Sequence, residues 1–207
     1  MNQERPTVFI VDDDSSVLRS LERLFQVEGY AVEGFAHPRQ MLEREPWQGP
    51  GCVVMDLRMP ELNGLELQQE LRQAGWKLPI VFISGHGDVP AAVKAMKAGA
   101  VDFLPKPFST TELLAAVERA LAQDSTERAA DGEREALRAR FSQLSPREWQ
   151  VCQLMARGLL NKQIAAELGT AEQTVRLQRS QLMKKLDVDS VAELVRLLER
   201  LDPQPLH

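Results

Sequence analysis

At residues 7–14 the chain reads Thr-Val-Phe-Ile-Val-Asp-Asp-Asp, a mostly apolar run followed at once by three carboxylates. Short apolar runs that end at, or are followed by, a carboxylate, hydroxyl or amine side chain recur three more times. Runs of this length that alternate with amphipathic stretches are typical of buried parallel strands connected by helices. The later runs, with the residue that closes or follows each, are Cys52–Met55 with Asp56, Ile80–Ile83 with Ser84, and Val101–Pro105 with Lys106.

Together with a weaker strand at Ala31–Phe35, these runs predict an α/β domain over residues 1–123. We expect a doubly wound, flavodoxin-like fold with a five-stranded parallel sheet. The strand C-termini of such a sheet share one edge, where sites are built. That edge would bring Asp12, Asp13, Asp56, Ser84 and Lys106 into one cleft. The covering helices are predicted at Ser16–Glu28, Pro38–Arg44, Gly64–Gln73, Val89–Ala98 and Thr110–Gln123.

The grouping of three carboxylates has a chemical explanation. Two like charges about 4 Å apart repel by roughly 1 to 4 kcal/mol, and a hard cation with oxygen ligands removes that repulsion. We expect Mg²⁺, or Mn²⁺ in its place, with Lys106 and Ser84 binding an incoming phosphoryl group. Asp56 is the predicted nucleophile, which would form an acyl phosphate. Singly, an Asp after a strand is often a cap and a Ser at a strand end often a turn residue, so the interpretation depends on the whole set.

Four segments of this first domain together resemble the receiver domain of two-component response regulators. They are Val11–Asp14, Met55–Pro60 with Gly64, Ile83–Gly87, and Lys106–Phe108. The resemblance implies that Asp56 accepts a phosphoryl group from a sensor histidine kinase. It also implies that the metal is held by Asp12, Asp13, Asp56 and the backbone carbonyl of Arg58.

The same resemblance implies a switch. Ser84 stands at the position of the switch hydroxyl, Phe103 at that of the switch aromatic, and Lys106-Pro107 at that of a cis peptide bond. Phosphate on Asp56 would draw the Ser84 hydroxyl inward, and the Phe103 ring would fill the vacated space, which biases a two-state packing. A plain core aromatic at Phe103 fits the sequence equally well.

Residues 124–141 form a charged linker, either loose or an extension of the preceding helix, and the sequence leaves both open. Residues 142–207 predict a small all-α domain of four helices. Ser145-Pro146-Arg147-Glu148 is a strong start signal for the first of them. Asn161 is expected to cap the second helix, Thr170 with Gln173 to cap the third, and Ser190 to start the fourth. Gly158 and Gly169 are expected to end the first two.

The second domain resembles the LuxR-type helix-turn-helix, and the whole chain the FixJ-like response regulators. The matching stretches are Leu144–Glu148, Gly158–Ala165 and Thr174–Arg176. Two positions depart from the pattern: Leu160 stands where a small polar residue is frequent, and Gln178 where a histidine is frequent. These departures affect the approach to DNA and the sequence read, and leave the fold unchanged.

The third helix of this domain, from Ala171 to about Leu186, has an inward stripe of Val175, Leu182 and Leu186. Its outward face carries short and basic residues, which suits the major groove. A solvated helix face is the alternative for the charged residues, and a merely exposed leucine for Leu177. We predict that Arg176, Leu177 and Ser180 approach bases, and that Lys162, Thr174, Arg179 and Lys184 contact phosphates.

These features predict a phosphorylation-dependent transcriptional regulator that pairs as a homodimer on promoter DNA. Its partners would be a sensor histidine kinase and DNA, with RNA polymerase as a further candidate. It would not be a turnover enzyme, because the phosphoryl group goes to its own Asp56 and leaves by self-dephosphorylation. The helix at Ser190–Leu201 would pack either against its twin or inside its own domain.

Composition agrees with this interpretation. The net charge is −5, yet basic residues outnumber acidic ones in residues 142–186, a weak indication of nucleic acid binding. No apolar run reaches the length of a membrane span and no signal pattern opens the chain, so we expect a cytoplasmic protein with no membrane partner. Cys52 and Cys152 are expected to be free, buried thiols.

Two other functions remain open from the sequence. One is a phosphatase of the haloacid-dehalogenase type that uses Asp12 as its nucleophile; it would leave Asp56 idle and lacks a fourth acidic motif. The other is an interaction protein whose receiver acts only through protein partners and whose helical domain has lost DNA binding.

Overall fold

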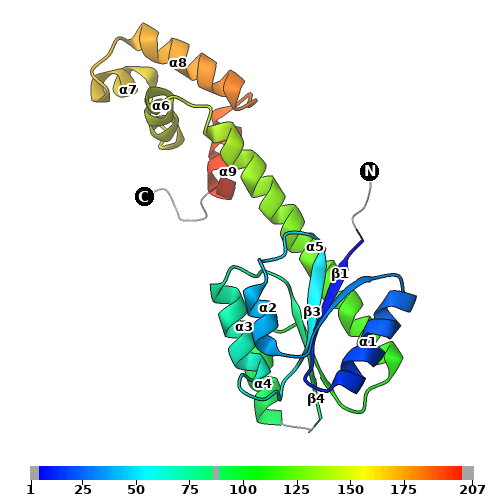
Figure 1. Ribbon diagram of the computed structural model, residues 1–207. Helices are drawn as coiled ribbons and strands as arrows, with labels where there is room; N and C mark the ends of the chain where they lie inside the picture. The colour runs from blue at the N-terminus through cyan, green and yellow to red at the C-terminus, as the bar shows by residue number, and fades with distance from the viewer. Residues whose placement is uncertain (1–4, 86–88, 202–207) are drawn as a thin grey trace. The chain divides into compact units, whose positions relative to one another are not determined.

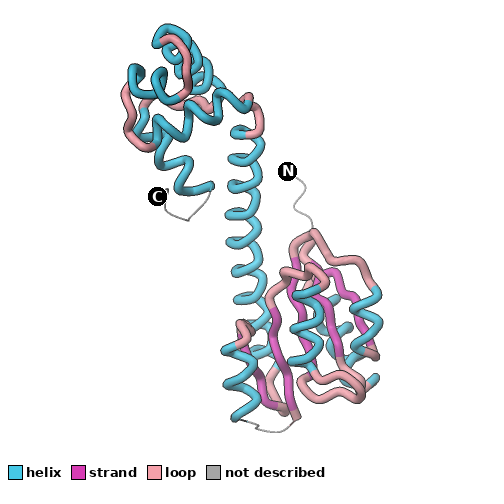
Figure 2. Tube along the Cα trace, turned by 90° about the vertical axis from the view of Figure 1, so that its left-hand side faces the viewer, coloured by secondary structure: helices cyan, strands magenta, loops and turns pink. Residues whose placement is uncertain are grey.

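A five-stranded parallel sheet forms the centre of the first unit, in the order β2-β1-β3-β4-β5 (Figures 1 and 2). The strands are β1 (Thr7–Val11), β2 (Ala31–Phe35), β3 (Gly51–Asp56), β4 (Ile80–Ser84) and β5 (Asp102–Pro105). Every residue of β1, β3 and β4 is buried, because helices cover both faces and leave no side for polar residues. The predicted doubly wound α/β architecture is confirmed.

The computed structural model describes residues 5–85 and 89–201, and the chain divides into two units, Met1–Arg128 and Ala129–His207. His86 and Gly87 of the receiver-like segment lie outside the described residues, as do residues 202–207 of the predicted second domain. Among the helices that are described, none has the length and apolar character needed to cross a bilayer.

Two apolar cores lie on the two faces of the sheet. The face with Phe9, Val53 and Phe82 is covered by α2 (Pro38–Glu43), α3 (Gly64–Gln73) and α4 (Val89–Lys97). The face with Val8, Val54 and Val81 is covered by α1 (Ser15–Val27) and the first part of α5 (Thr110–Phe141). Figure 1 shows this layered arrangement around the sheet. The predicted helices are therefore present, each within about one residue of its expected start.

The sequence left open whether residues 124–141 are a loose linker or an extension of α5, and the structure shows which. The helix continues without a break through residues 124–141 and is 32 residues long. Residues 125–136 are all exposed, and Leu137 and Phe141 then enter the core of the second unit. The linker is therefore an extension of the helix, and its last turn supplies core residues to the helical unit.

Four further helices complete the second unit: α6 (Pro146–Ala156), α7 (Asn161–Glu167), α8 (Glu172–Lys185) and α9 (Val191–Leu201). The predicted start of α6 is confirmed, because the Ser145 hydroxyl accepts from the Glu148 amide at 3.2 Å and Glu148 Oε2 accepts from the Ser145 amide at 2.8 Å. Ser190 likewise accepts a hydrogen bond from the Glu193 amide, at 3.1 Å. The apolar positions of α9, including Leu194 and Leu198, are buried in its own unit.

Two of the predicted helix caps are wrong. Asn161 is the first residue of α7, and the residue before it, Leu160, donates its amide to the Gln163 side chain at 2.8 Å. Helix α8 begins after Ala171, which has no side chain able to accept a hydrogen bond, so Thr170 does not cap it. In both cases a polar residue near the expected start suggested a cap. Helix α7 begins one residue too early for Asn161 to be its cap, and α8 begins one residue too late for Thr170 to be its cap.

The two cysteines are confirmed as free and buried. Burial raises the pKa of both thiols, that of Cys152 to about 12. Both side chains therefore behave as small apolar core residues.

Candidate functional site

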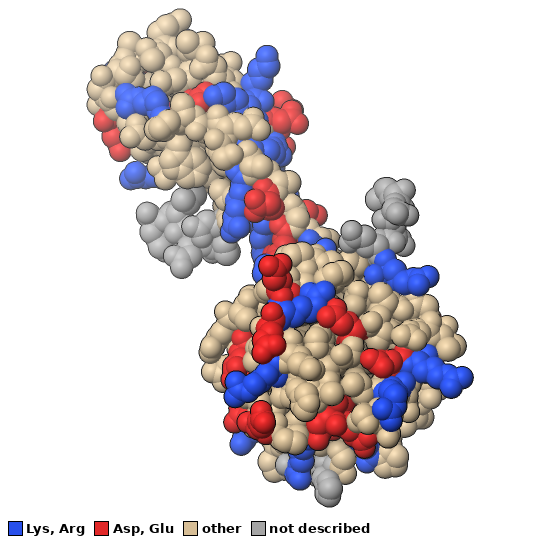
Figure 3. Space-filling view, viewed as in Figure 1, with Lys and Arg blue, Asp and Glu red and all other residues tan. Residues whose placement is uncertain are grey.

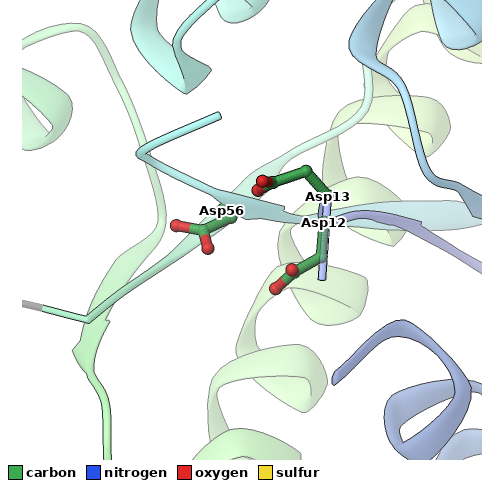
Figure 4. A group of neighbouring side chains, drawn as sticks. All are labelled: Asp12, Asp13 and Asp56. Carbon is green, nitrogen blue, oxygen red and sulfur yellow. The ribbon is translucent and has the colours of Figure 1, made fainter. Parts of the chain in front are cut away.

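The ends of the parallel strands bring the predicted phosphorylation residues together. Asp12 follows β1 and Asp56 ends β3, and both are buried, whereas Asp13 is exposed. Figure 4 shows the three carboxylates projecting from these two neighbouring strand ends. One carboxylate oxygen of each lies within 4.8 Å of the others. The sequence therefore located an acidic cluster correctly from strand ends that are far apart along the chain.

Lys106, directly after β5, supplies the positive charge of this cluster. Its Nζ donates to Asp56 Oδ2 at 2.7 Å and to Asp12 Oδ2 at 2.9 Å. Burial raises the pKa of Asp12, although its hydrogen bond with Lys106 opposes that shift. Burial also opposes the charge on Lys106, but the hydrogen bonds to Asp56 and Asp12 raise its pKa above the ordinary value. The lysine thus remains a cation beside the two buried carboxylates.

Backbone amides orient the remaining carboxylate oxygens. The Asp14 amide donates to Asp12 Oδ1 at 2.9 Å, and the Arg58 amide donates to Asp56 Oδ1 at 3.1 Å. Gly64 packs against the same segment, where an added Cβ would lie 2.6 Å from the carbonyl oxygen of Asp56. The Asp56 carboxylate is therefore held in one orientation by groups on both of its oxygens.

The two predicted switch residues lie on neighbouring strands, where Ser84 pairs with Pro105 and Phe103 pairs with Phe82. Ser84 is fully buried at the end of β4, and its carbonyl accepts a hydrogen bond from the Lys106 amide at 2.6 Å. Phe103 in β5 is half-buried and packs against the core on the α2–α4 face of the sheet. The Lys106–Pro107 peptide bond is cis.

In the second unit, α8 separates buried from exposed residues as its periodicity indicated. Val175, Leu182 and Leu186 are fully buried, and Leu177 is 59% exposed. Among the residues with predicted DNA contacts, Arg179 alone is half-buried. The others are exposed: Lys162, Thr174, Arg176, Ser180 and Lys184. Over the visible face of each unit, Figure 3 shows basic and acidic side chains interspersed.

Two of the predicted DNA contacts already have partners inside the protein. Arg176 pairs with Glu172 one turn earlier, at 3.0 Å, and Arg179 donates to Asn161 Oδ1 at 2.6 Å. The second bond links α8 to the first residue of α7, and no pattern in the sequence predicted it. Asn161 therefore serves as a hydrogen-bond acceptor for Arg179 instead of capping its own helix.

An ion pair that the sequence did not predict, with a buried carboxylate and a partly exposed lysine, anchors the end of α8. Lys185 Nζ lies 2.7 Å from Glu148 Oε2, so the capping glutamate of α6 also binds the last residue of α8. The Lys185 ammonium and the Ser145 amide hold the pKa of Glu148 below its ordinary value. This contact fixes the C-terminal end of the helix that carries most of the predicted DNA contacts.

Two family models match the chain. The response regulator receiver domain matches residues 8–118, and the model of bacterial regulatory proteins of the luxR family matches residues 142–198.

Curated relatives extend over almost the whole chain. Nodulation protein W of Bradyrhizobium diazoefficiens is 48% identical over 194 residues, which are 94% of this chain and 86% of the relative. Response regulator protein TodT of Pseudomonas putida is 43% identical over 201 residues, 97% of this chain and 88% of the relative. Transcriptional regulatory protein FixJ of Bradyrhizobium diazoefficiens is 40% identical, with 93% of this chain and 94% of the relative covered.

Solved structures of response regulators also match nearly the whole chain. The response regulator StyR matches with a TM-score of 0.82 at 48% identity, covering 95% of this chain and 99% of that chain. Full-length FixJ from B. japonicum matches with a TM-score of 0.58 at 38% identity, covering 97% of this chain and 98% of that chain.

Proposed function

Since this chain belongs to the response regulators of two-component systems, we propose that Asp56 accepts a phosphoryl group from a sensor histidine kinase. The observation that supports this most is the position of the Asp56 carboxylate at the carboxyl end of β3, held between the Arg58 amide and the Lys106 ammonium. The P–N bond of a phosphohistidine breaks as a P–O bond to Asp56 forms. Lys106 stabilises the negative charge on the transferred group.

The acidic cluster fits a divalent cation. Its donors are all oxygens, and three carboxylates lie close enough to share one ion, which suits Mg²⁺ and, as an alternative, Mn²⁺. Asp12, Asp13, Asp56 and the backbone carbonyl of Arg58 would hold it. When bound, the ion neutralises the carboxylates and the oxygens of the phosphoryl group. The protein's own contribution is to orient Asp56 and to keep Lys106 charged beside it.

Ser84 and Phe103 are the residues that we propose respond to phosphorylation. The Ser84 side chain is buried at the end of β4 and lies on the strand next to β5, which carries Phe103. Inward movement of the hydroxyl toward a phosphorylated Asp56 would open space for the Phe103 ring. Phe103 is half-buried, so such a movement would bury more of its ring and alter the surface around α4 and β5.

The second unit is the proposed DNA-binding domain, with α8 as the reading helix. Arg176, Leu177 and Ser180 would face base edges, and Lys162, Thr174, Arg179 and Lys184 the phosphates. A transcription factor of this type acts in the cytoplasm, pairs as a homodimer when phosphorylated, and contacts RNA polymerase at its promoters. Because the apolar face of α9 is buried in the core of its own unit, we propose that the homodimer interface lies on the receiver.

A regulator of this kind is not a turnover enzyme, since the phosphoryl group ends on the protein itself and is lost by hydrolysis. The haloacid-dehalogenase alternative would require Asp12 to be the nucleophile. In the structure Asp12 is fully buried and both its oxygens accept hydrogen bonds, one from Lys106 and one from the Asp14 amide. Together with the two family matches, this favours the response regulator.

Genomic footprinting with the wild type and Asp56→Asn tests the proposal. We expect the wild type to protect discrete sites when the kinase is active, and the variant to lose that phosphate-dependent protection. The same protection by both proteins would contradict the role of Asp56. No protected site with either protein would instead support the interaction-protein alternative, whose helical domain has lost DNA binding.

A further inference from the structure

Helix α5 carries a buried carboxylate, Asp124, at the end of the segment that packs on the sheet. Asp124 is 4% exposed, and its Oδ2 accepts a hydrogen bond from the Gly51 amide at 3.1 Å. Gly51 is the first residue of β3, the strand that ends with Asp56. Burial raises the pKa of Asp124, while the bond to Gly51 opposes that shift. Burying an aspartate here costs desolvation energy, and the helix could form without it. We therefore ask what its contact with β3 contributes.

Arg128, one turn further along α5, binds the same loop. Its Nη1 donates to the carbonyls of Gln48 and Gly49, the latter at 3.1 Å, and its Nε lies 4.0 Å from Asp124 Oδ2. Two successive turns of α5 thus hold the backbone of residues 48–51. We name this set of contacts, made by Asp124 and Arg128, the α5 clamp.

Beyond the clamp, α5 has little to stabilise it. Residues 125–136 are all exposed, and within the described part of the chain none of them belongs to an apolar core. Ion pairs of this stretch outside the clamp join Arg134 with Asp131, Arg138 with Glu135, and Glu133 with Arg200 of α9, the last at 2.6 Å. All three of these pairs are exposed, so each contributes little. Gly132, a poor helix former, lies near its middle. Figure 3 shows charged side chains of both signs over this part of α5.

The exposed stretch of residues 125–136 would be marginal as a helix in water on its own, since isolated helices shorter than about 12–15 residues barely form. Its helical state must therefore come from the elements that hold its two ends. The distal end is held by Leu137 and Phe141 in the core of the second unit. The proximal end is held by the α5 clamp.

We propose that the α5 clamp is the receiver-side anchor of a marginally stable linker helix, and that it determines whether residues 125–136 act as a rigid helix or as a flexible tether. The clamp holds the N-terminal end of the strand whose C-terminal end carries Asp56. Asp124 and Arg128 are thereby positioning residues for the response to phosphorylation. This role rests on the proposed function, whereas the helix-anchoring role does not.

Hydrogen exchange of the full-length protein, followed by mass spectrometry, tests the anchor. Asp124→Ala and Arg128→Ala should each speed exchange of amides 125–136 at least about tenfold, with β1 to β4 still protected. Asp124→Asn, which keeps an acceptor for the Gly51 amide, should have a smaller effect. Glu127→Ala is the matched control, since Glu127 is exposed and its side chain accepts a hydrogen bond from Gln123 on the same helix, and it should change exchange less than threefold.

Gly132→Ala provides an independent check, because a Cβ there meets nothing within 4 Å. It should slow exchange of residues 125–136 and partly restore protection in the Asp124→Ala background. Equal exchange in Arg128→Ala and Glu127→Ala would overturn the anchor. The anchor would also be overturned if the sheet unfolded in Asp124→Ala while exchange of residues 125–136 stayed unchanged in Arg128→Ala.

DNA affinity with and without phosphorylation tests the consequence. The factor by which phosphorylation raises DNA affinity should be at least three times smaller in Arg128→Ala than in the wild type. Labelling of Asp56 by acetyl phosphate should be the same in both proteins. An unchanged ratio despite a loosened linker would refute the positioning role. A wild type whose DNA binding ignores phosphorylation would refute the proposed function instead, and the exchange experiment would still decide the anchor.

Discussion

Glu148 performs two tasks in the second unit, and two substitutions separate them. Its side chain is 6% exposed and binds both the Ser145 amide, at 2.8 Å, and Lys185 Nζ, at 2.7 Å. Glu148→Gln keeps an acceptor for the capping box but removes the charge that faces Lys185. Glu148→Ala removes the cap and the charge together.

The expected losses follow from these contacts. A lost helix cap costs about 1 kcal/mol. The Lys185 side chain is 39% exposed, so solvent screens the ion pair and reduces its contribution to about 0.5–1 kcal/mol. We therefore expect the second unit to lose about 0.5–1 kcal/mol in Glu148→Gln and about 2 kcal/mol in Glu148→Ala, allowing for the lost acceptor.

The stability difference should depend on pH in a defined direction. The pKa of Glu148 is lowered from its ordinary value of 4.5, chiefly by the hydrogen bond from Lys185. Its charge therefore stabilises the folded unit above that value, and the contribution is lost as the pH falls through the lowered pKa of the folded state. At pH 7 the wild type should exceed Glu148→Gln in stability, and in strong acid the two should converge.

Urea unfolding followed by the indole N–H resonance of Trp149 measures this, because Trp149 packs on Phe141 in the second unit and reports on that unit alone. Equal stability of the wild type and both variants at pH 7 would refute the two contacts. A difference between wild type and Glu148→Gln that survives in strong acid would refute the electrostatic origin.

Three further experiments test the site and the DNA-binding face. Gly64→Ala should slow phosphorylation of Asp56 by acetyl phosphate at least about tenfold, because the new Cβ would lie 2.6 Å from the Asp56 carbonyl; an unchanged labelling rate would show that the loop yields freely. Asn161→Ala and Arg179→Ala should each weaken DNA binding, and the double variant should be no weaker than Arg179→Ala, since one bond joins them; additive losses would contradict a shared role. Lys184→Ala should reduce the slope of log K against log salt by about 0.9, and an unchanged slope would remove Lys184 from the phosphate contacts.

The fold was predictable where one local pattern was sufficient. Buried parallel strands read as short apolar runs, so β1, β3 and β4 were found within one residue, and the shared edge of a parallel sheet then brought Asp12, Asp56 and Lys106 together. The Ser145 capping box was predictable for the same reason, because its hydroxyl and its glutamate lie three residues apart.

Contacts between distant segments were not predictable from such patterns. Asp124 read as one more charged linker residue, because its partner Gly51 lies 73 residues away. The pairs Lys185 with Glu148 and Arg179 with Asn161 join different helices, and nothing local to either helix signals them. The polar residues Asn161 and Thr170 suggested caps that the turns do not use. Local chemistry thus located the acidic site, while packing determined how its surroundings are held.

Phosphopeptide mapping of the protein after incubation with acetyl phosphate and Mg²⁺ is the most direct measurement of the central claim. We predict one added phosphoryl group, located at Asp56, that disappears when Mg²⁺ is chelated and is absent from Asp56→Asn. A phosphoryl group found on Asp12, or labelling that Asp56→Asn retains in full, would contradict the account.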